Sequence, residues 1–365
     1  MSEIKSTDGG RTVILDTSLK EPDIIFYNTR RDPFKVYGLY KYREQDVCRR
    51  LPKEVAEATG KSVSILSAQT SGARLRFKTD SAYVAIHVKM PYVNKLAHMP
   101  LTGTSGFDLY IESDGGSRYA GTFMPETNAV DGYESIIKFG SRKMRSLTIN
   151  FPSYNAVDDL YIGLQSDARV GLGEFYRSKL PIVYYGSSIT QGACSSRPGN
   201  TYQNIIARRY DLDYMNLGFS GNARAELPIV KYMSSLDMLA FVSDYDHNAP
   251  NSDYLRETHC RMYDAIRENH PDVPYIMLSR PDFYANSIEC IKRRDVVIDT
   301  FRYARANGDN NVYYIDGASI FRGPDEDGCT VDGAHPNDHG MYKMADAIGK
   351  MLERALRGSP MFSEI

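Results

Sequence analysis

The segment VYYGSSITQG, residues 183–192, places two hydroxyl side chains where an apolar stretch ends. The apolar run reads as a buried strand that stops at Gly186, and the polar residues after it read as the start of a helix. A serine at this point lies near the positive end of the helix, and its own backbone N–H can donate to an oxyanion. We predict that Ser188 is a nucleophile, with Ser187 as the alternative.

A histidine and an aspartate that suit such a serine follow the last predicted strand. In the stretch DGAH, Asp332 precedes His335 by three residues. In a loop, this spacing allows the carboxylate to hold one imidazole nitrogen while the other nitrogen faces a serine. We therefore expect His335 to accept the proton of the serine, and Asp332 to fix the tautomer of the ring and stabilise the imidazolium.

Two more strand ends carry residues that could bind an oxyanion. The stretch NLGFSGNAR contains Gly218 and Gly221, where the missing side chain lets the backbone approach a ligand closely. The stretch DYDHNAP contains Asn248, whose side-chain amide is a hydrogen-bond donor. Each motif alone is common in turns. Because they occur at the ends of successive predicted strands, they favour one shared site.

The pattern of strands and helices after Leu180 explains why these strand ends should meet. Short apolar strands alternate with helical stretches: we expect strands at 181–186, 213–219, 238–245, 274–281 and 311–317, with helices at 201–210, 226–236, 252–270, 287–308 and 341–352. This alternation predicts a parallel sheet with right-handed crossovers and helices on both faces. Such sheets bind ligands beyond the carboxyl ends of their strands.

The first part of the chain has a different periodicity. Strict alternation of apolar and polar residues predicts antiparallel strands at 74–78, 83–89, 107–112, 147–151 and 160–164, with a short helical turn at 54–60. Alternation of this kind predicts sheets with one face buried and one face exposed, as in a sandwich. We therefore divide the chain into a β-sandwich accessory domain, residues 1–175, and a catalytic α/β domain, residues 180–358.

The ordered motifs of the second domain resemble the four blocks of the SGNH (GDSL-like) hydrolase superfamily. The resemblance implies that Ser188 is the nucleophile, that Gly221 and Asn248 complete an oxyanion hole with the Ser188 N–H, and that Asp332 and His335 complete the triad. It also implies a flavodoxin-like α/β/α fold that needs no cofactor and no metal. Two departures concern Ser187, where the superfamily commonly has Asp, and Asp246, where the third block commonly has Gly.

The stretch GFDLY, residues 106–110, resembles the GxDLY signature of a jelly-roll-like β-sandwich that precedes SGNH domains in bacterial carbohydrate esterases. This resemblance implies an esterase that removes short acyl groups, with acetyl as the expected group, from a small acylated saccharide. A lipolytic esterase or thioesterase is one alternative. A carbohydrate-binding protein that has lost catalytic activity is another.

Composition and charge argue against some classes of binding partner. The formal net charge of −2 and the lack of a basic block argue against nucleic-acid binding, and no run of 18 apolar residues predicts a membrane span. The five cysteines are widely spaced and lack a CxxC pair, which favours free thiols. With no secretory signal at the N-terminus, we expect a cytoplasmic protein. The sequence is compatible with a homo-oligomer.

Other motifs have plainer interpretations. His335 and His339 have a spacing that suits a metal on a helix, but no third ligand is evident, and 324–333 begins like a calcium loop without its closing Glu. Four further side chains lie in or near the blocks and could contact substrate, although surface or ion-pair roles are the simpler interpretation: His247, Arg197, Arg224 and Arg280. We expect His87 to be solvated on its strand.

Overall fold

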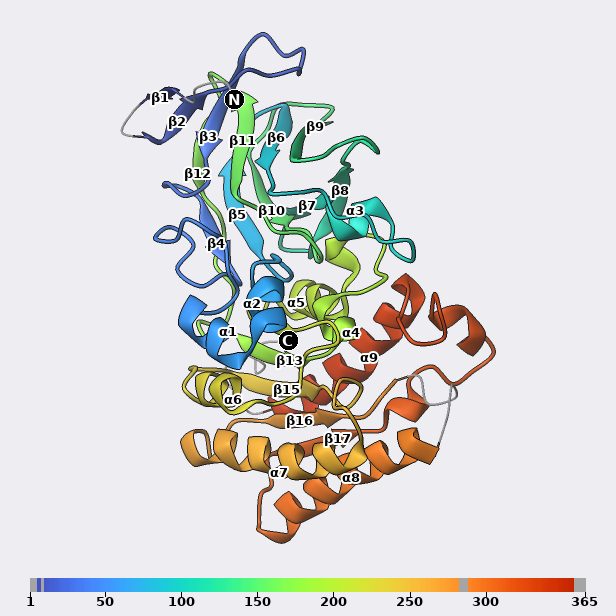
Figure 1. Ribbon diagram of the computed structural model, residues 1–365. Helices are drawn as coiled ribbons and strands as arrows, with labels where there is room; N and C mark the ends of the chain where they lie inside the picture. Colours follow the sequence, from blue (N-terminus) through green and yellow to red (C-terminus); the bar gives the residue numbers. More distant parts are fainter. Residues whose placement is uncertain (1–4, 8–9, 282–287, 358–365) are drawn as a thin grey trace. The chain divides into compact units, whose positions relative to one another are not determined.

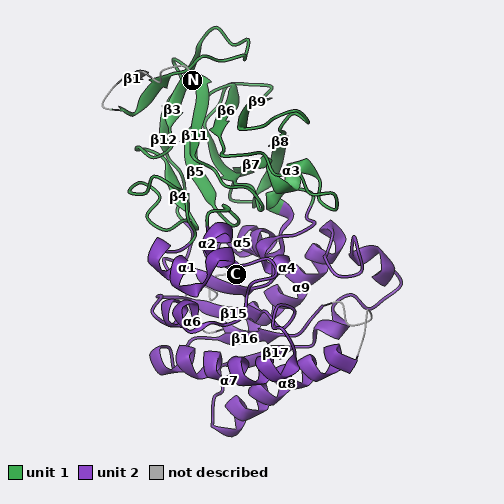
Figure 2. Cartoon of the chain, in the orientation of Figure 1, with its two compact units in different colours: residues 1–50, 68–175, 196–199 green, residues 51–67, 176–195, 200–365 purple. Residues whose placement is uncertain are grey.

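The computed structural model describes residues 5–7, 10–281 and 288–357. The chain forms two compact units, shown in Figure 2: the first comprises 1–50, 68–175 and 196–199, and the second comprises 51–67, 176–195 and 200–365. The predicted division at 175–180 differs from these units in two segments. Residues 51–67 group with the second unit, and residues 196–199, which lie beyond the predicted boundary, group with the first.

The first unit is built almost wholly of antiparallel strands. Its elements, drawn in Figure 1, are β1 (Lys5–Thr7), β2 (Thr12–Ile14), β3 (Ile24–Asn28), β4 (Lys35–Tyr37), β5 (Arg74–Thr79), β6 (Tyr83–Lys89), α3 (Leu101–Thr104), β7 (Phe107–Glu112), β8 (Arg118–Phe123), β9 (Gly132–Lys138), β10 (Arg145–Asn150), β11 (Asp159–Gln165) and β12 (Val170–Leu172). One sheet has the order β1-β2-β3-β11-β6-β9. The other has the order β12-β5-β10-β7-β8, and β4 pairs with β5.

The core of this unit lies between the two sheets, as the alternation predicts. Leu75 and Leu109 from one sheet and Ile86 and Ile162 from the other are all fully buried in one apolar cluster. The predicted exposed face is wrong for β5, β7 and β10, because their alternate residues are buried too. Those residues are polar or charged: Arg74, Arg76, Asp108, Thr148 and Asn150.

The second unit contains a parallel sheet with helices on both faces. Its elements are α1 (Lys53–Thr59), α2 (Lys61–Ser67), β13 (Ile182–Gly186), α4 (Ser188–Gln191), α5 (Tyr202–Tyr210), β14 (Tyr214–Gly218), α6 (Leu227–Ser234), β15 (Ala240–Asp244), α7 (Ser252–Asn269), β16 (Tyr275–Leu278), α8 (Ile288–Ala306), β17 (Val312–Ile315) and α9 (Asp338–Ala355). The strand order β14-β13-β15-β16-β17 is the flavodoxin-like order.

Each face of this sheet has its own apolar core. Tyr185 and Phe241 pack in one cluster with residues of α6, α7 and α8, while Tyr184 and Val242 pack in another with residues of α5 and α9. The predicted fold class, an antiparallel sandwich followed by an α/β/α domain, is therefore confirmed. None of the helices described is long and apolar enough to span a membrane.

The two short helices α1 and α2 complete the first of these cores. Ala56 of α1 and Val63 of α2 are buried in the same cluster as Ile229 of α6. Only a short helical turn was predicted here, within a β domain. The seven-residue helix α2 follows α1 directly through Gly60, and both helices bury their apolar side chains against the α/β unit.

Candidate active site

Ser187 and Ser188 have different surroundings at the start of α4. Ser187 is the N-cap residue of the helix, and its Oγ accepts a hydrogen bond from the Ile189 N–H at 3.2 Å. N-cap serines commonly satisfy a free helical N–H in this way. Ser188 Oγ instead lies 2.9 Å from His335 Nε2. Of the two serines, the structure therefore brings Ser188 together with the predicted base.

Gly186 makes the turn before these serines possible. A Cβ on Gly186 would overlap the backbone carbonyl of Asp244 and the hydroxyl of Thr190. The adjoining strands continue this tight packing, because a Cβ on Gly218 would overlap the backbone of Gln191 in α4. Gly218 thus lets α4 lie close to β14. The backbone that approaches Gly218 closely is therefore that of α4, whereas the sequence predicts a close approach to a ligand.

Asp332 and His335 form the pair that the sequence predicts. His335 Nδ1 lies 2.7 Å from Asp332 Oδ2, and the other carboxylate oxygen accepts hydrogen bonds from the His335 N–H at 2.8 Å and the Ala334 N–H at 3.1 Å. Partial burial raises the pKa of Asp332, but these hydrogen bonds outweigh that effect and lower the pKa to about 2. Because an ionised carboxylate only accepts hydrogen bonds, Nδ1 carries a proton, and Nε2 is the nitrogen that can accept from Ser188.

The loop that carries this pair is held by short backbone contacts. The Val331 N–H donates to the His335 carbonyl at 2.9 Å, and Thr330 and Pro336 form an isolated bridge. Asn337 then caps α9 by accepting a hydrogen bond from the Gly340 N–H at 3.2 Å. Two consecutive local motifs therefore fix His335 immediately before a long helix.

Gly221 and Asn248 follow the two strands that flank β13. In the register of the sheet, Gly186 pairs with Gly218 at the end of β14 and with Asp244 at the end of β15, so all three strands end at one edge. Gly221 is exposed and has a φ of 69°, which favours glycine. Asn248 Oδ1 accepts a hydrogen bond from the Ala223 N–H at 3.2 Å, which ties the two loops together.

Both parts of the chain match known protein families. Residues 179–353 match the GDSL-like Lipase/Acylhydrolase family, and residues 24–170 match the GxDLY family, described as the N-terminus of an SGNH-hydrolase-type esterase. The chain belongs to the GDSL-like (SGNH) hydrolases with an N-terminal GxDLY domain. It has no significant match among curated proteins.

Solved structures share the fold of this GDSL-like hydrolase over nearly its whole length. A Bacteroides ovatus protein named for its likeness to GDSL lipases is 25% identical, with a TM-score of 0.82 over 92% of this chain and 98% of its own. A salicylyl-acyltransferase from a tetracycline biosynthetic pathway is 19% identical, with a TM-score of 0.75 over 94% of this chain and 100% of its own. A family two carbohydrate esterase from Cellvibrio japonicus is 11% identical, with a TM-score of 0.60 over 92% of this chain and 98% of its own.

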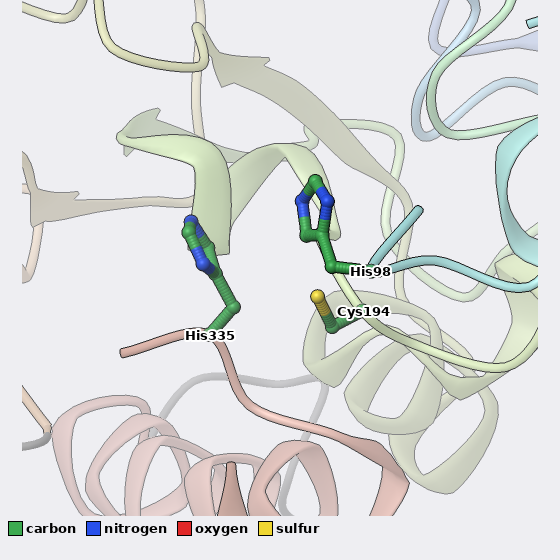
Figure 3. Close-up of side chains that lie close together, drawn as sticks. All are labelled: His98, Cys194 and His335. Carbon is green, nitrogen blue, oxygen red and sulfur yellow. The ribbon is translucent and has the colours of Figure 1, made fainter. Parts of the chain in front are cut away.

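Cys194 lies beside His335 in the GDSL-like unit, a neighbour that the sequence reasoning did not identify (Figure 3). The Cys194 sulfur and a ring nitrogen of His335 are within 4.8 Å of one another. Burial raises the pKa of Cys194 to about 12, and the nearby Asp332 carboxylate adds to the shift. The side chain is therefore a neutral thiol at ordinary pH. The backbone φ of Cys194, 65°, is unusual for a residue with a side chain.

The third GDSL block contains a cluster of two buried aspartates and a histidine. Ligand atoms of Asp244, Asp246 and His247 lie within 4.8 Å of one another. Asp246 replaces the glycine of the family pattern, and its Oδ2 accepts a hydrogen bond from the Arg280 N–H at 3.0 Å. Arg293 Nη1 donates to the carbonyls of Asp246 and Ala249. The carboxylate of Asp246 thus ties the Asn248 loop to the end of β16, which a glycine could not do.

The remaining motifs consist of exposed side chains or of side chains held by hydrogen bonds within the protein. His339 is exposed in the first turn of α9, and within the part of the chain that the structure describes it belongs to no group of three potential metal ligands. Both ring nitrogens of His335 are hydrogen-bonded. Among the residues described, the acidic side chains of 324–333 form no cluster of three potential metal ligands. The prediction that His87 is simply solvated is wrong, since its Nδ1 lies 2.9 Å from Glu134 Oε1. Arg224 is exposed and donates to the Gly221 carbonyl.

Proposed function

We propose that the protein is a serine esterase that removes short acyl groups, acetyl above all, from carbohydrate hydroxyls. The observation that carries the proposal is the continuous hydrogen-bonded chain from Ser188 Oγ through His335 to Asp332, with distances of 2.9 Å and 2.7 Å. Because the ionised carboxylate of Asp332 holds Nδ1, Nε2 is the nitrogen that faces the hydroxyl, as acyl transfer through a serine needs.

In the proposed reaction, Ser188 Oγ attacks the ester carbonyl while His335 Nε2 takes the hydroxyl proton. The carbonyl oxygen becomes an oxyanion, which the backbone N–H groups of Ser188 and Gly221 and the side-chain amide of Asn248 stabilise. Each such donor typically contributes about 3 kcal/mol to the transition state. His335 then protonates the leaving alcohol as the C–O bond breaks, and an acyl-enzyme remains on Ser188.

Water completes the cycle through the same groups. His335 takes a proton from the attacking water, the hydroxide adds to the acyl carbon, and the second tetrahedral intermediate collapses to release the acid. The proton returns to Ser188 Oγ. Asp332 keeps Nδ1 protonated throughout, so that Nε2 is always the nitrogen that exchanges the proton.

Two considerations support a short acyl group on a sugar. The sequence contains no extended apolar segment that would predict a lid over a long acyl chain. The two-domain fold is also that of family two carbohydrate esterases, and this likeness is the reason to place a saccharide first among possible alcohols. A lipolytic esterase or thioesterase is the competing function within the same chemistry.

A chain-length series tests the proposal. We expect the wild type to release p-nitrophenol from p-nitrophenyl acetate much faster than from the octanoate ester. Ser188→Ala should lose turnover, whereas Ser187→Ala should retain it, because only Ser188 contacts His335. Acetate release from acetylated mono- and oligosaccharides would then identify the alcohol. A preference for the octanoate or for acyl thioesters would contradict the proposal, and turnover that survives Ser188→Ala would reject the nucleophile.

A further inference from the structure

The aspartate and the tyrosine of the GFDLY motif have no part in the chemistry above, but they share one partner. Arg197 Nη1 donates to Asp108 Oδ2 at 2.8 Å and also to the hydroxyl of Tyr110. Asp108 and Tyr110 are alternate residues of β7 and therefore lie on the same face of the strand. The guanidinium of Arg197 also lies 4.2 Å from the ring centre of Tyr119 in β8, within the range of a cation–π interaction.

Asp108 is fully buried and has several donors besides Arg197. Its Oδ2 also accepts from the Gly199 N–H at 2.8 Å, and its Oδ1 accepts from Asn150 Nδ2 at 2.7 Å. A carboxylate so buried is tolerated in a fold only when it is paired with a charge and hydrogen-bonded. Asp108, Tyr110 and Tyr119 thus surround the guanidinium of Arg197, and we call these three residues the socket.

The segment that occupies this socket is residues 196–199. All four residues belong to the first unit, although the residues on both sides of them belong to the second. Thr102 Oγ1 donates to the Ser196 carbonyl at 2.6 Å, which holds the beginning of the segment. At its end, a Cβ on Gly199 would lie 2.5 Å from Asp108 Oδ2 and 2.7 Å from Tyr110 Cε2. Glycine is therefore required sterically where the segment meets the motif.

The residues that flank the segment contact α4, which begins with Ser188, and α9, which begins three residues after His335. Ser195 Oγ donates to the Gly192 carbonyl at 2.9 Å, at the end of the helix that begins with Ser188. Asn200 Nδ2 donates to Asp338 Oδ2 at 2.7 Å, in the first turn of the helix that follows His335. The segment held by the socket is thus joined by short contacts to the Ser188 side and to the His335 side of the site.

We propose that Asp108, Tyr110 and Arg197 are positioning residues for the reaction of Ser188 with His335. The GxDLY motif holds residues 196–199, and the two flanks of this segment restrain α4 and the start of α9, so that Ser188 and His335 stay at hydrogen-bond distance. This proposal rests on Ser188 being the nucleophile of the function proposed above. It gives the motif of the β unit a role in catalysis that involves no contact with substrate.

The test compares variants of the socket and of Arg197 with a matched ion pair elsewhere in the first unit. Asp108→Asn and Arg197→Met remove the charge pair, and Tyr110→Phe removes one hydrogen bond only. The control is Asp80→Asn, since Asp80 is also buried and its Oδ2 lies 2.9 Å from Arg169 Nε, in a pair that does not involve residues 196–199. All variants are assayed with p-nitrophenyl acetate well below their melting temperatures.

We expect kcat to fall at least 10-fold in Asp108→Asn and Arg197→Met and about threefold in Tyr110→Phe, with little change in KM. The rate at which a fluorophosphonate labels Ser188 should fall in parallel. Hydrogen exchange of a peptide covering 195–200 should accelerate in the same variants, because the Gly199 N–H loses its acceptor. Asp80→Asn should lower the melting temperature yet keep kcat, labelling and exchange within twofold of wild type.

The outcomes separate this inference from the proposed function. Faster exchange with unchanged kcat and labelling would overturn the positioning role, and unchanged exchange would overturn the socket itself. If wild type hydrolysed no ester, the proposed function would fail, yet fluorophosphonate labelling would still report whether the socket sets the reactivity of Ser188. If Asp108→Asn did not fold, Tyr110→Phe would decide, and a wild-type labelling rate in that variant would reject the proposal.

Discussion

The two sides of the candidate site are built in different ways. Ser188 lies in a buried turn, where Gly186 packs against Asp244 and the Thr190 carbonyl accepts hydrogen bonds from the buried side chains of Gln203 and Asn216, both at 2.7 Å. By contrast, the side chains of Asp332 and His335 are 37% and 27% exposed. The geometry on the serine side depends on core packing, whereas the geometry on the histidine side depends on local hydrogen bonds. Substitutions of the residues that pack around Ser188 should therefore act through folding, whereas substitution of the carboxylate that holds His335 should act through chemistry.

The largest effect should come from Asp332→Asn on the exposed side. The asparagine amide cannot hold Nδ1 in its protonated form, so the tautomer that lets Nε2 accept from Ser188 is lost. We expect kcat for p-nitrophenyl acetate to fall about 10³- to 10⁴-fold, while the melting temperature falls only modestly, because the hydrogen bonds that the carboxylate makes are local and partly exposed. Steady-state kinetics and thermal unfolding on the same preparation check both parts. A large loss of stability would show that the loop is not locally determined.

Gly186→Ala on the buried side should have the opposite signature. The added methyl group would overlap the backbone of Asp244 and the hydroxyl of Thr190, and overpacking of this kind costs about 1–3 kcal/mol or more. We expect a clear loss of unfolding free energy, measured by urea denaturation, together with loss of activity.

Gly333→Ala is the matched control in the histidine loop. Its φ of 81° makes alanine strained, but a Cβ there would meet no atom within 4 Å. We expect a loss of about 1 kcal/mol. If Gly333→Ala destabilised the fold as much as Gly186→Ala, the contrast between the two sides would be wrong.

The same contrast explains which parts of the site the sequence could predict. The strand-end motifs are local, and the observed strands β6 and β7 have the predicted bounds, Tyr83–Lys89 and Phe107–Glu112. The Asp332–His335 contact is local as well, since three residues separate its partners. For Gly221 and Asn248, the structure places both at the expected edge of the sheet, and their role as oxyanion donors stays a prediction.

The sequence could not predict polar contacts between residues that lie far apart in the chain. Alternation in β7 predicts that Asp108 is exposed, because a charged residue between apolar neighbours reads as the solvent side of a strand. The residue is fully buried because Arg197, 89 positions later, supplies its counter-charge. Likewise, the apolar residues of α1 and α2 give no sign that they pack against α6, since a hydrophobic face does not name its partner. The missed features are therefore those whose two halves lie far apart in the chain.

Gln203→Ala tests the buried side more gently. Gln203 is fully buried and donates to the Thr190 carbonyl, which Asn216 also contacts. Removal of one of two donors to a buried carbonyl should cost about 1–2 kcal/mol, with kcat reduced less than 10-fold. Urea midpoints and initial rates check these values. A drop in kcat as large as that of Asp332→Asn would mean that the serine side acts through chemistry as well.

Asp244→Asn should change stability by an amount that depends on pH. Burial raises the pKa of Asp244 to about 8, and the neighbouring Asp246 carboxylate adds to the shift. Because the pKa in the folded state lies above that in the unfolded chain, the folded protein holds a proton that the unfolded chain releases, and stability is lost as pH rises from about 4 through about 8. Asparagine removes this loss while its carbonyl can still accept from Thr190, 3.2 Å from Asp244 Oδ2.

The difference in unfolding free energy between Asp244→Asn and wild type should therefore grow with pH. We expect it to be smallest at about pH 4 and to favour the variant increasingly as the pH rises towards 8, where the folded protein itself begins to release the proton. Urea denaturation at several pH values measures this difference directly, and other titrating groups cancel because they are common to both proteins. A difference that is constant with pH would mean that Asp244 is ionised throughout, its charge balanced by the Arg280 and Arg293 side chains that lie around Asp246.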